Sequence, residues 1–69
     1  MYKVIKNSTV GDITLFESED YDEVLNKAIQ IAMNQTGNPE FHQEIPTALE
    51  NRGYYLCGWS EVLIKIIEE

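Results

Sequence analysis

The chain has 69 residues, of which 12 are acidic and 5 are basic, giving a net charge of −7 at pH 7. A surface this negative repels nucleic acid and anionic membranes and attracts basic partners. We therefore expect no direct binding to nucleic acid or to a membrane. Hydrophobic residues make up 43% of the chain, too many for a disordered acidic tail. Length and composition predict one small globular domain that covers residues 1–69.

Cys57 is the single cysteine, which excludes a disulfide within the chain and is typical of a reducing compartment. Residues 1–6 lack the long apolar stretch of a signal peptide. The apolar runs are also far shorter than the roughly 20 residues that span a bilayer. These features predict a cytoplasmic protein. A single core of this size rarely supplies more than roughly 3–5 kcal/mol, so association with a partner or a second copy is a natural source of further stability.

The first half of the chain predicts a hairpin followed by a helix. Residues 2–7 and 13–17 are strand-like, and Gly11-Asp12 between them is a turn signal. Asp20 is expected to cap a helix over residues 21–35, with Glu23 completing a capping box. One apolar face with helical spacing runs along this segment. Its members are Tyr21, Val24, Leu25, Ala28, Ile29, Ala32 and Met33.

The second half is less regular. Pro46 and Gly53 suit the beginning and the end of a short helix. Residues 54–57 favour a strand, and Gly58 suggests a bulge or bend. Residues 60–67 fit either a strand or a helix capped by Ser60, and their β-branched content favours the strand.

Together these elements predict an α+β fold in the order ββααβ. We expect a small antiparallel three-stranded sheet with the long helix packed on one face and a short second helix beside it. Such a sheet leaves its other face and at least one edge uncovered. Both are natural places for a partner to bind.

An acidic run lies at the junction of the predicted hairpin and the long helix. Part of it has a structural explanation, because Asp20 is a cap, and Asp22 and Glu23 offset the helix dipole in the first turn. Glu17 and Glu19 have no such role and are either solvated loop residues or part of a functional patch. In the functional interpretation, the carboxylates of all five residues imitate phosphates and dock on a basic groove of a partner.

Aromatic residues near the C-terminus form a second candidate surface. On a strand, Tyr55 and Trp59 share one face with Cys57, and they either pack in the core or lie on the open face of the sheet. Exposed Tyr and Trp are favoured anchors of protein interfaces. We therefore include Tyr55 and Trp59 with the acidic run as candidate partner-binding residues.

No pattern in the sequence indicates catalysis or a cofactor. The acidic run lacks the spacing of a calcium loop, so we expect no metal. Cys57 with His42 as its base is conceivable, but a nucleophile also needs an orienting group and a cleft. A lone cysteine in an apolar strand is usually a packed core thiol. We expect no cofactor, no catalytic residue and no enzyme activity.

In size, charge and compact α+β build, the chain resembles the small acidic proteins that phages use against host defence, such as anti-CRISPR, anti-restriction and DNA-mimic inhibitors. The resemblance rests on no motif and assigns no residue. It implies a non-enzymatic inhibitor acting in the host cytoplasm, whose partner is a larger protein with a basic surface, such as a nucleic-acid-binding defence protein. The alternative is an assembly module that forms a homodimer or joins a complex through its open sheet face or edge.

Overall fold

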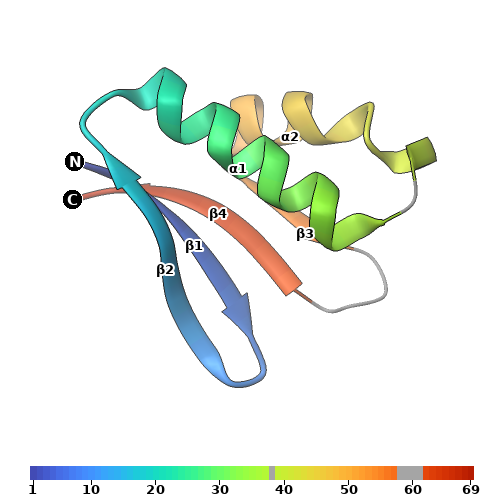
Figure 1. The fold of residues 1–69 in the computed structure, drawn as a ribbon, viewed down its shortest axis with the longest axis horizontal. Coiled ribbons are helices and arrows are strands. Elements are labelled where there is room, and N and C mark those ends of the chain that lie inside the picture. Colours follow the sequence, from blue (N-terminus) through green and yellow to red (C-terminus); the bar gives the residue numbers. More distant parts are fainter. Residues whose placement is uncertain (38, 58–61) are drawn as a thin grey trace.

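A computed structural model describes residues 1–37, 39–57 and 62–69. The molecule has two layers, a four-stranded antiparallel sheet and two α-helices that lie together on one of its faces (Figure 1). The elements in chain order are β1 (Tyr2–Ser8), β2 (Gly11–Ser18), α1 (Tyr21–Thr36), the short 3-10 helix η1 (Pro39–Phe41), α2 (Glu44–Arg52), β3 (Tyr54–Cys57) and β4 (Val62–Glu68).

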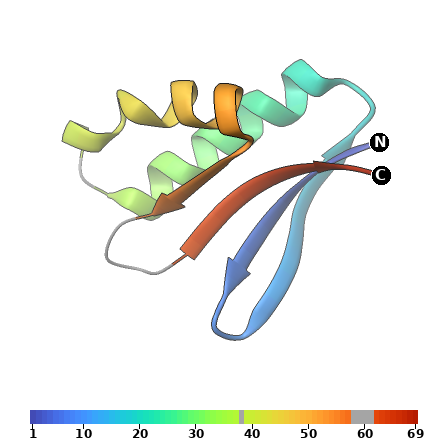
Figure 2. The same cartoon turned by 180° about the vertical axis from the view of Figure 1, so that it is seen from behind.

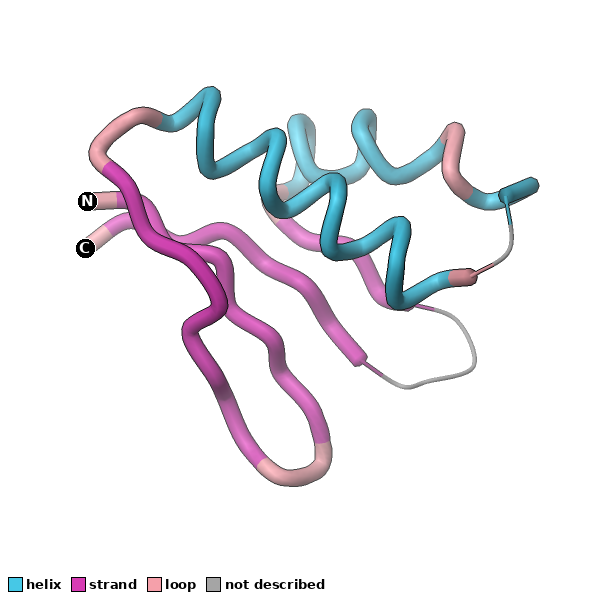
Figure 3. Tube along the Cα trace, viewed as in Figure 1, coloured by secondary structure: helices cyan, strands magenta, loops and turns pink. Residues whose placement is uncertain are grey.

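The strands are arranged in the order β2-β1-β4-β3, so β2 and β3 form the two edges of the sheet. The predicted hairpin of β1 and β2 is confirmed, and it runs from Tyr2 opposite Ser18 to Ser8 opposite Gly11. Its register shifts between Val4 and Ile5, which is a β-bulge or irregularity in the ladder. The tip of this hairpin projects beyond the helical layer (Figure 3).

The predicted count of three strands is wrong, because the C-terminal segment forms two strands. β3 and β4 pair antiparallel, with Cys57 opposite Val62 and Tyr54 opposite Lys65. β3 and β4 therefore run in opposite directions and are not parts of a single strand. The bend expected at Gly58 lies outside the described residues. The favoured strand is confirmed for Val62–Glu68, and pairing of β4 with β1 places it in the middle of the sheet.

The long helix is confirmed at Tyr21–Thr36. Its end is set by Gly37, which takes a left-handed conformation (φ 73°) and donates its N–H to Met33 O at 3.2 Å. The short helix α2 also ends at the predicted glycine, Gly53, with φ 80°. Gly53 leads directly into β3 and accepts a backbone hydrogen bond from Ile66 N at 2.7 Å.

The core lies between the helices and the covered face of the sheet. Val24, Ala28 and Ala32 of α1 meet strand residues such as Val4 and Ile64, all fully buried. The helix α2 adds Ile45, Ala48 and Leu49. Each fully buried Val, Leu or Ile side chain contributes roughly 1.5–3 kcal/mol relative to exposure. Figure 2 shows both helices above the same face of the sheet and the two ends of the chain beside each other.

Candidate docking surface at the acidic end

Strand pairing extends the acidic run into a larger surface. Tyr2 is opposite Ser18 on one side and Glu68 on the other, so the start of β1 joins the ends of β2 and β4. Figure 1 shows these ends close to the loop that leads into α1. We call this region the acidic end. Its seven acidic residues are Glu17, Glu19, Asp20, Asp22, Glu23, Glu68 and Glu69.

Two aromatic residues, Tyr2 and Tyr21, pack against each other at the acidic end. The rings of Tyr2 and Tyr21 meet edge to face with their centroids 5.2 Å apart. A hydrogen bond to the Glu68 side chain and the negative charge of that carboxylate raise the pKa of the Tyr2 hydroxyl. This pair joins β1 to the first turn of α1, so it fixes the position of the helix start relative to the sheet.

Lys3 partly neutralises the acidic end. Its Nζ lies 2.7 Å from Glu69 Oε2 and 3.9 Å from Glu17 Oε2. The hydrogen bond and charge of Glu69 raise the pKa of Lys3, and Lys3 in turn lowers the pKa of Glu69. Glu17 therefore has a basic neighbour that the sequence did not reveal. Its side chain remains 55% exposed.

The capping geometry differs from the prediction in one respect. Asp20 is the N-cap as expected, and its Oδ1 accepts from Asp22 N at 3.0 Å. The Asp20 N–H donates to Ser18 Oγ at 3.1 Å, the role that a capping box would assign to Glu23. Glu23 is exposed and does not accept the Asp20 N–H that a capping box would assign to it. Within the described residues, Glu19, Asp22 and Glu23 have no ion-pair partner.

The face of the sheet opposite the helices has a different character, and we call it the open face. Alternation along the strands places Ile5, Leu63, Tyr54 and Leu56 there. Away from the acidic end this face carries the ion pair of Lys65 and Asp12, with Lys65 Nζ 3.7 Å from Asp12 Oδ2. The Lys3 contacts lie where the open face meets the acidic end. The open face is therefore partly apolar and locally balanced in charge, in contrast to the acidic end.

Of the two aromatic residues predicted to bind a partner, Tyr55 and Trp59, the structure describes only Tyr55. Tyr55 is 8% exposed and packs in the core under the helices, so it takes the core position of the two that the sequence left open. Its neighbours Tyr54 and Leu56 take the exposed positions at 44% and 59%. Trp59 lies outside the described residues.

Cys57 is buried as a core thiol. It is 1% exposed, its Sγ lies 3.9 Å from Ala32 O, and burial raises the pKa of the thiol. A nucleophilic cysteine needs the opposite, a lowered pKa and access to substrate. His42 follows η1, where its backbone N–H donates to Pro39 O at 3.2 Å.

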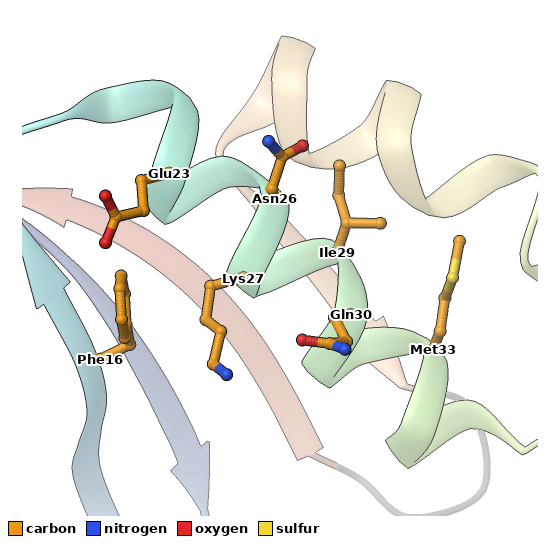
Figure 4. A pocket seen from close by; sticks show the side chains of 7 residues that line it. All are labelled: Phe16, Glu23, Asn26, Lys27, Ile29, Gln30 and Met33. Atoms are coloured by element: carbon orange, nitrogen blue, oxygen red, sulfur yellow. The ribbon is translucent and has the colours of Figure 1, made fainter.

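An open groove of about 620 Å³ runs along the outer side of α1 beside β2 (Figure 4). Phe16 projects from β2 toward Glu23 of the helix, and Lys27 extends beside it with its Nζ 5.8 Å from the centre of the Phe16 ring. Ile29 and Met33 continue the lining along the helix. Sequence analysis missed this groove, because Phe16 and α1 meet only when the hairpin folds under the helix.

Three searches bear on the kind of protein this is: for a metal cluster, for a membrane-spanning helix, and for similar known proteins. In the described parts of the chain, no three His, Cys, Asp or Glu side chains gather closely enough to hold a metal ion. None of the described helices combines the length and apolarity needed to cross a membrane. No protein-family model, curated protein or solved structure matches the chain.

Proposed function

We propose that this protein is a non-enzymatic binding protein that docks its acidic end on a basic site of a larger protein and blocks that site. The observation that carries the proposal is the addition of Glu68 and Glu69 to the run at Glu17–Glu23 by strand pairing. Lys3 is the basic side chain that offsets them. Carboxylates concentrated in this way attract a basic groove for the same electrostatic reason that phosphates do.

The partner class follows from this electrostatic argument. A protein that binds nucleic acid presents the basic surface that the acidic end would occupy, and occupation would exclude its nucleic acid. In size, charge and α+β build, the chain is also similar to phage anti-defence inhibitors of the anti-CRISPR and DNA-mimic type. We therefore propose a nucleic-acid-binding defence protein as the partner.

Paired charge-reversal variants test the proposal. The double variant Glu17→Lys/Glu19→Lys changes the acidic end, and Glu44→Lys/Glu50→Lys makes the same change in net charge on exposed positions of α2. The wild type and both variants serve as baits in a host lysate at low and high salt. We expect the wild type and the α2 variant to capture the same nucleic-acid-binding protein at low salt, and the acidic-end variant to lose it.

Equal capture by both variants would show that net charge alone attracts the partner and would reject the acidic end as the docking surface. A second readout is competition, since duplex DNA or RNA should displace the protein from a partner whose basic site it occupies. Capture that withstands high salt and excess nucleic acid would contradict an electrostatic inhibitor.

A second candidate function is an assembly module that associates through the open face. Its support is the exposure of Tyr54 and Leu56 next to Leu63, beside charges that are already paired. Balanced charge reduces the repulsion that two copies of net charge −7 would otherwise feel. A monomeric mass by light scattering throughout the micromolar range would contradict self-assembly.

A further inference from the structure

The edge strand β2 is long and accessible. It contains eight residues, forms one side of the sheet, and is exposed at all positions except Phe16 and Ser18, which are partly buried. Among the described residues, no strand pairs with its outer edge. Backbone N–H and C=O groups on such an edge are a template for another extended chain.

The groove beside this edge gives an added strand a place for its side chains. Phe16 of β2 and the outer side of α1 line the groove, and Ile13, 47% exposed, lies farther along β2. The register shift at Leu15 places Ile13 on the same side of β2 as Phe16. Successive side chains of an extended peptide point to opposite faces of the sheet. Every second side chain of a peptide paired with β2 would therefore contact Ile13, Phe16 or the aliphatic part of Lys27.

The charges around the edge define the flanks of the peptide. Glu17 and Asp12 lie on the open-face side of β2, toward opposite ends of the strand. Each is near a lysine of a neighbouring strand, yet their side chains remain 55% and 53% exposed. Glu23 lies on the helix side opposite Phe16. Lys27 occupies the middle of the groove over the Phe16 ring. Complementary charge therefore places basic residues at the ends of a bound peptide and neutral or apolar residues at its centre.

These observations disfavour a second copy as the occupant. The strand Gly11–Ser18 contains Asp12 and Glu17 and no basic residue. Pairing two β2 strands would align acidic and neutral side chains only, between molecules that each carry a charge of −7. Like charges placed opposite each other across strands are destabilising.

We propose that β2 recognises an extended, basic-flanked segment of a partner protein by strand addition, with the segment lying between β2 and α1. This inference rests on the proposed function and names the mode of contact, since β2 runs directly into the acidic end. Backbone pairing would supply affinity, and the groove with its acidic rim would supply selectivity.

The test uses a synthetic peptide of alternating valine and threonine with two lysines at each end, titrated into the full chain labelled with ¹⁵N. We expect the largest amide shifts in residues 11–18 and slower hydrogen exchange at the β2 amides that do not pair with β1. Shifts confined to the acidic end, without β2 protection, would overturn strand addition and leave the proposed function intact. β2 protection that appears without peptide, together with a doubled mass, would also overturn it.

Two N-methylated versions of the peptide isolate the backbone contribution. Each carries N-methyl groups on one of the two alternate sets of central residues, so charge and side chains are preserved. Only one edge of the peptide can pair with β2, and we expect one version to bind roughly ten- to hundredfold more weakly while the other retains its affinity. Equal affinities for the two versions would overturn the inference.

Two matched variants of the protein show which edge of the sheet binds the peptide. Ile13→Lys and Leu56→Lys add the same charge at exposed positions of opposite edges, β2 and β3. We expect Ile13→Lys to weaken peptide binding and Leu56→Lys to leave it unchanged. A glycine-rich peptide with the same lysines controls for charge, because equal binding by it would reject strand addition while still supporting an electrostatic docking surface.

Discussion

The two edges of the sheet differ in how they are held. β3 has only four residues, and two of them, Tyr55 and Cys57, are buried under the helices. β2 is twice as long, yet none of its residues is buried. The edge formed by β3 is thus part of the core, whereas β2 is held mainly by backbone pairing with β1. The weakly anchored edge is also the one next to the acidic end, and it is the part of the sheet to which we propose that a partner binds.

The largest expected effect is on the free energy of unfolding, which a substitution on β3 should lower far more than one on β2. Tyr55→Ala should cost about 3–5 kcal/mol, because it removes a buried aromatic side chain from β3. That equals the whole stability expected of a domain this small, about 3–5 kcal/mol, so far-UV circular dichroism should show a largely unfolded chain at 25 °C. Ile13→Ala on β2 should remain folded, with a change within about 0.5 kcal/mol in urea unfolding. Similar losses for the two variants would contradict the asymmetry.

The sequence predicts the local elements well, because their signals are local. The start of α1 follows from Asp20, and its end from Gly37 in the left-handed conformation. The apolar face with helical spacing contains the buried residues Val24, Ala28 and Ala32. These features depend on neighbours within one or two helical turns, so no knowledge of the tertiary structure is needed.

The missed features depend on residues far apart in the chain. Two adjacent β-rich runs are compatible with one bent strand or with a hairpin, and the pairing of Cys57 with Val62 decides between them. Alternation places Tyr55 and Cys57 on one face but does not say which face the helices cover. Glu68 and Glu69 join the acidic run only because β4 pairs with β1. Their position could be predicted only after the strand order was known.

A smaller effect is expected at the junction where β2 leads into α1. Asp20→Ala removes the carboxylate that accepts from Asp22 N and should cost about 1 kcal/mol, measured by urea unfolding. Asp22→Asn serves as a control, since it removes a first-turn charge worth roughly 0.3–1 kcal/mol and keeps the cap. Amide exchange should accelerate more at residues 21–24 than at residues 54–57. Equal acceleration at both places would mean that the cap stabilises the whole domain uniformly and does not hold the β2 side in particular.

The smallest effect concerns the ion pair of Lys3 and Glu69, which links β1 to the residue that follows β4. The ion pair stabilises the protein in the pH range between the pKa of Glu69 and the pKa of Lys3, where both side chains are charged. The lowered pKa of Glu69 means that stability falls as the pH drops through that pKa, and the raised pKa of Lys3 means that it falls as the pH rises through that value. Glu69→Gln should flatten both limbs of a plot of unfolding free energy against pH. Glu50→Gln, an exposed change on α2, should leave both limbs in place. Because both partners of the pair are exposed to solvent, the difference should shrink at high salt. A salt-independent difference would mean that Glu69 contributes through packing at the acidic end and not through the ion pair.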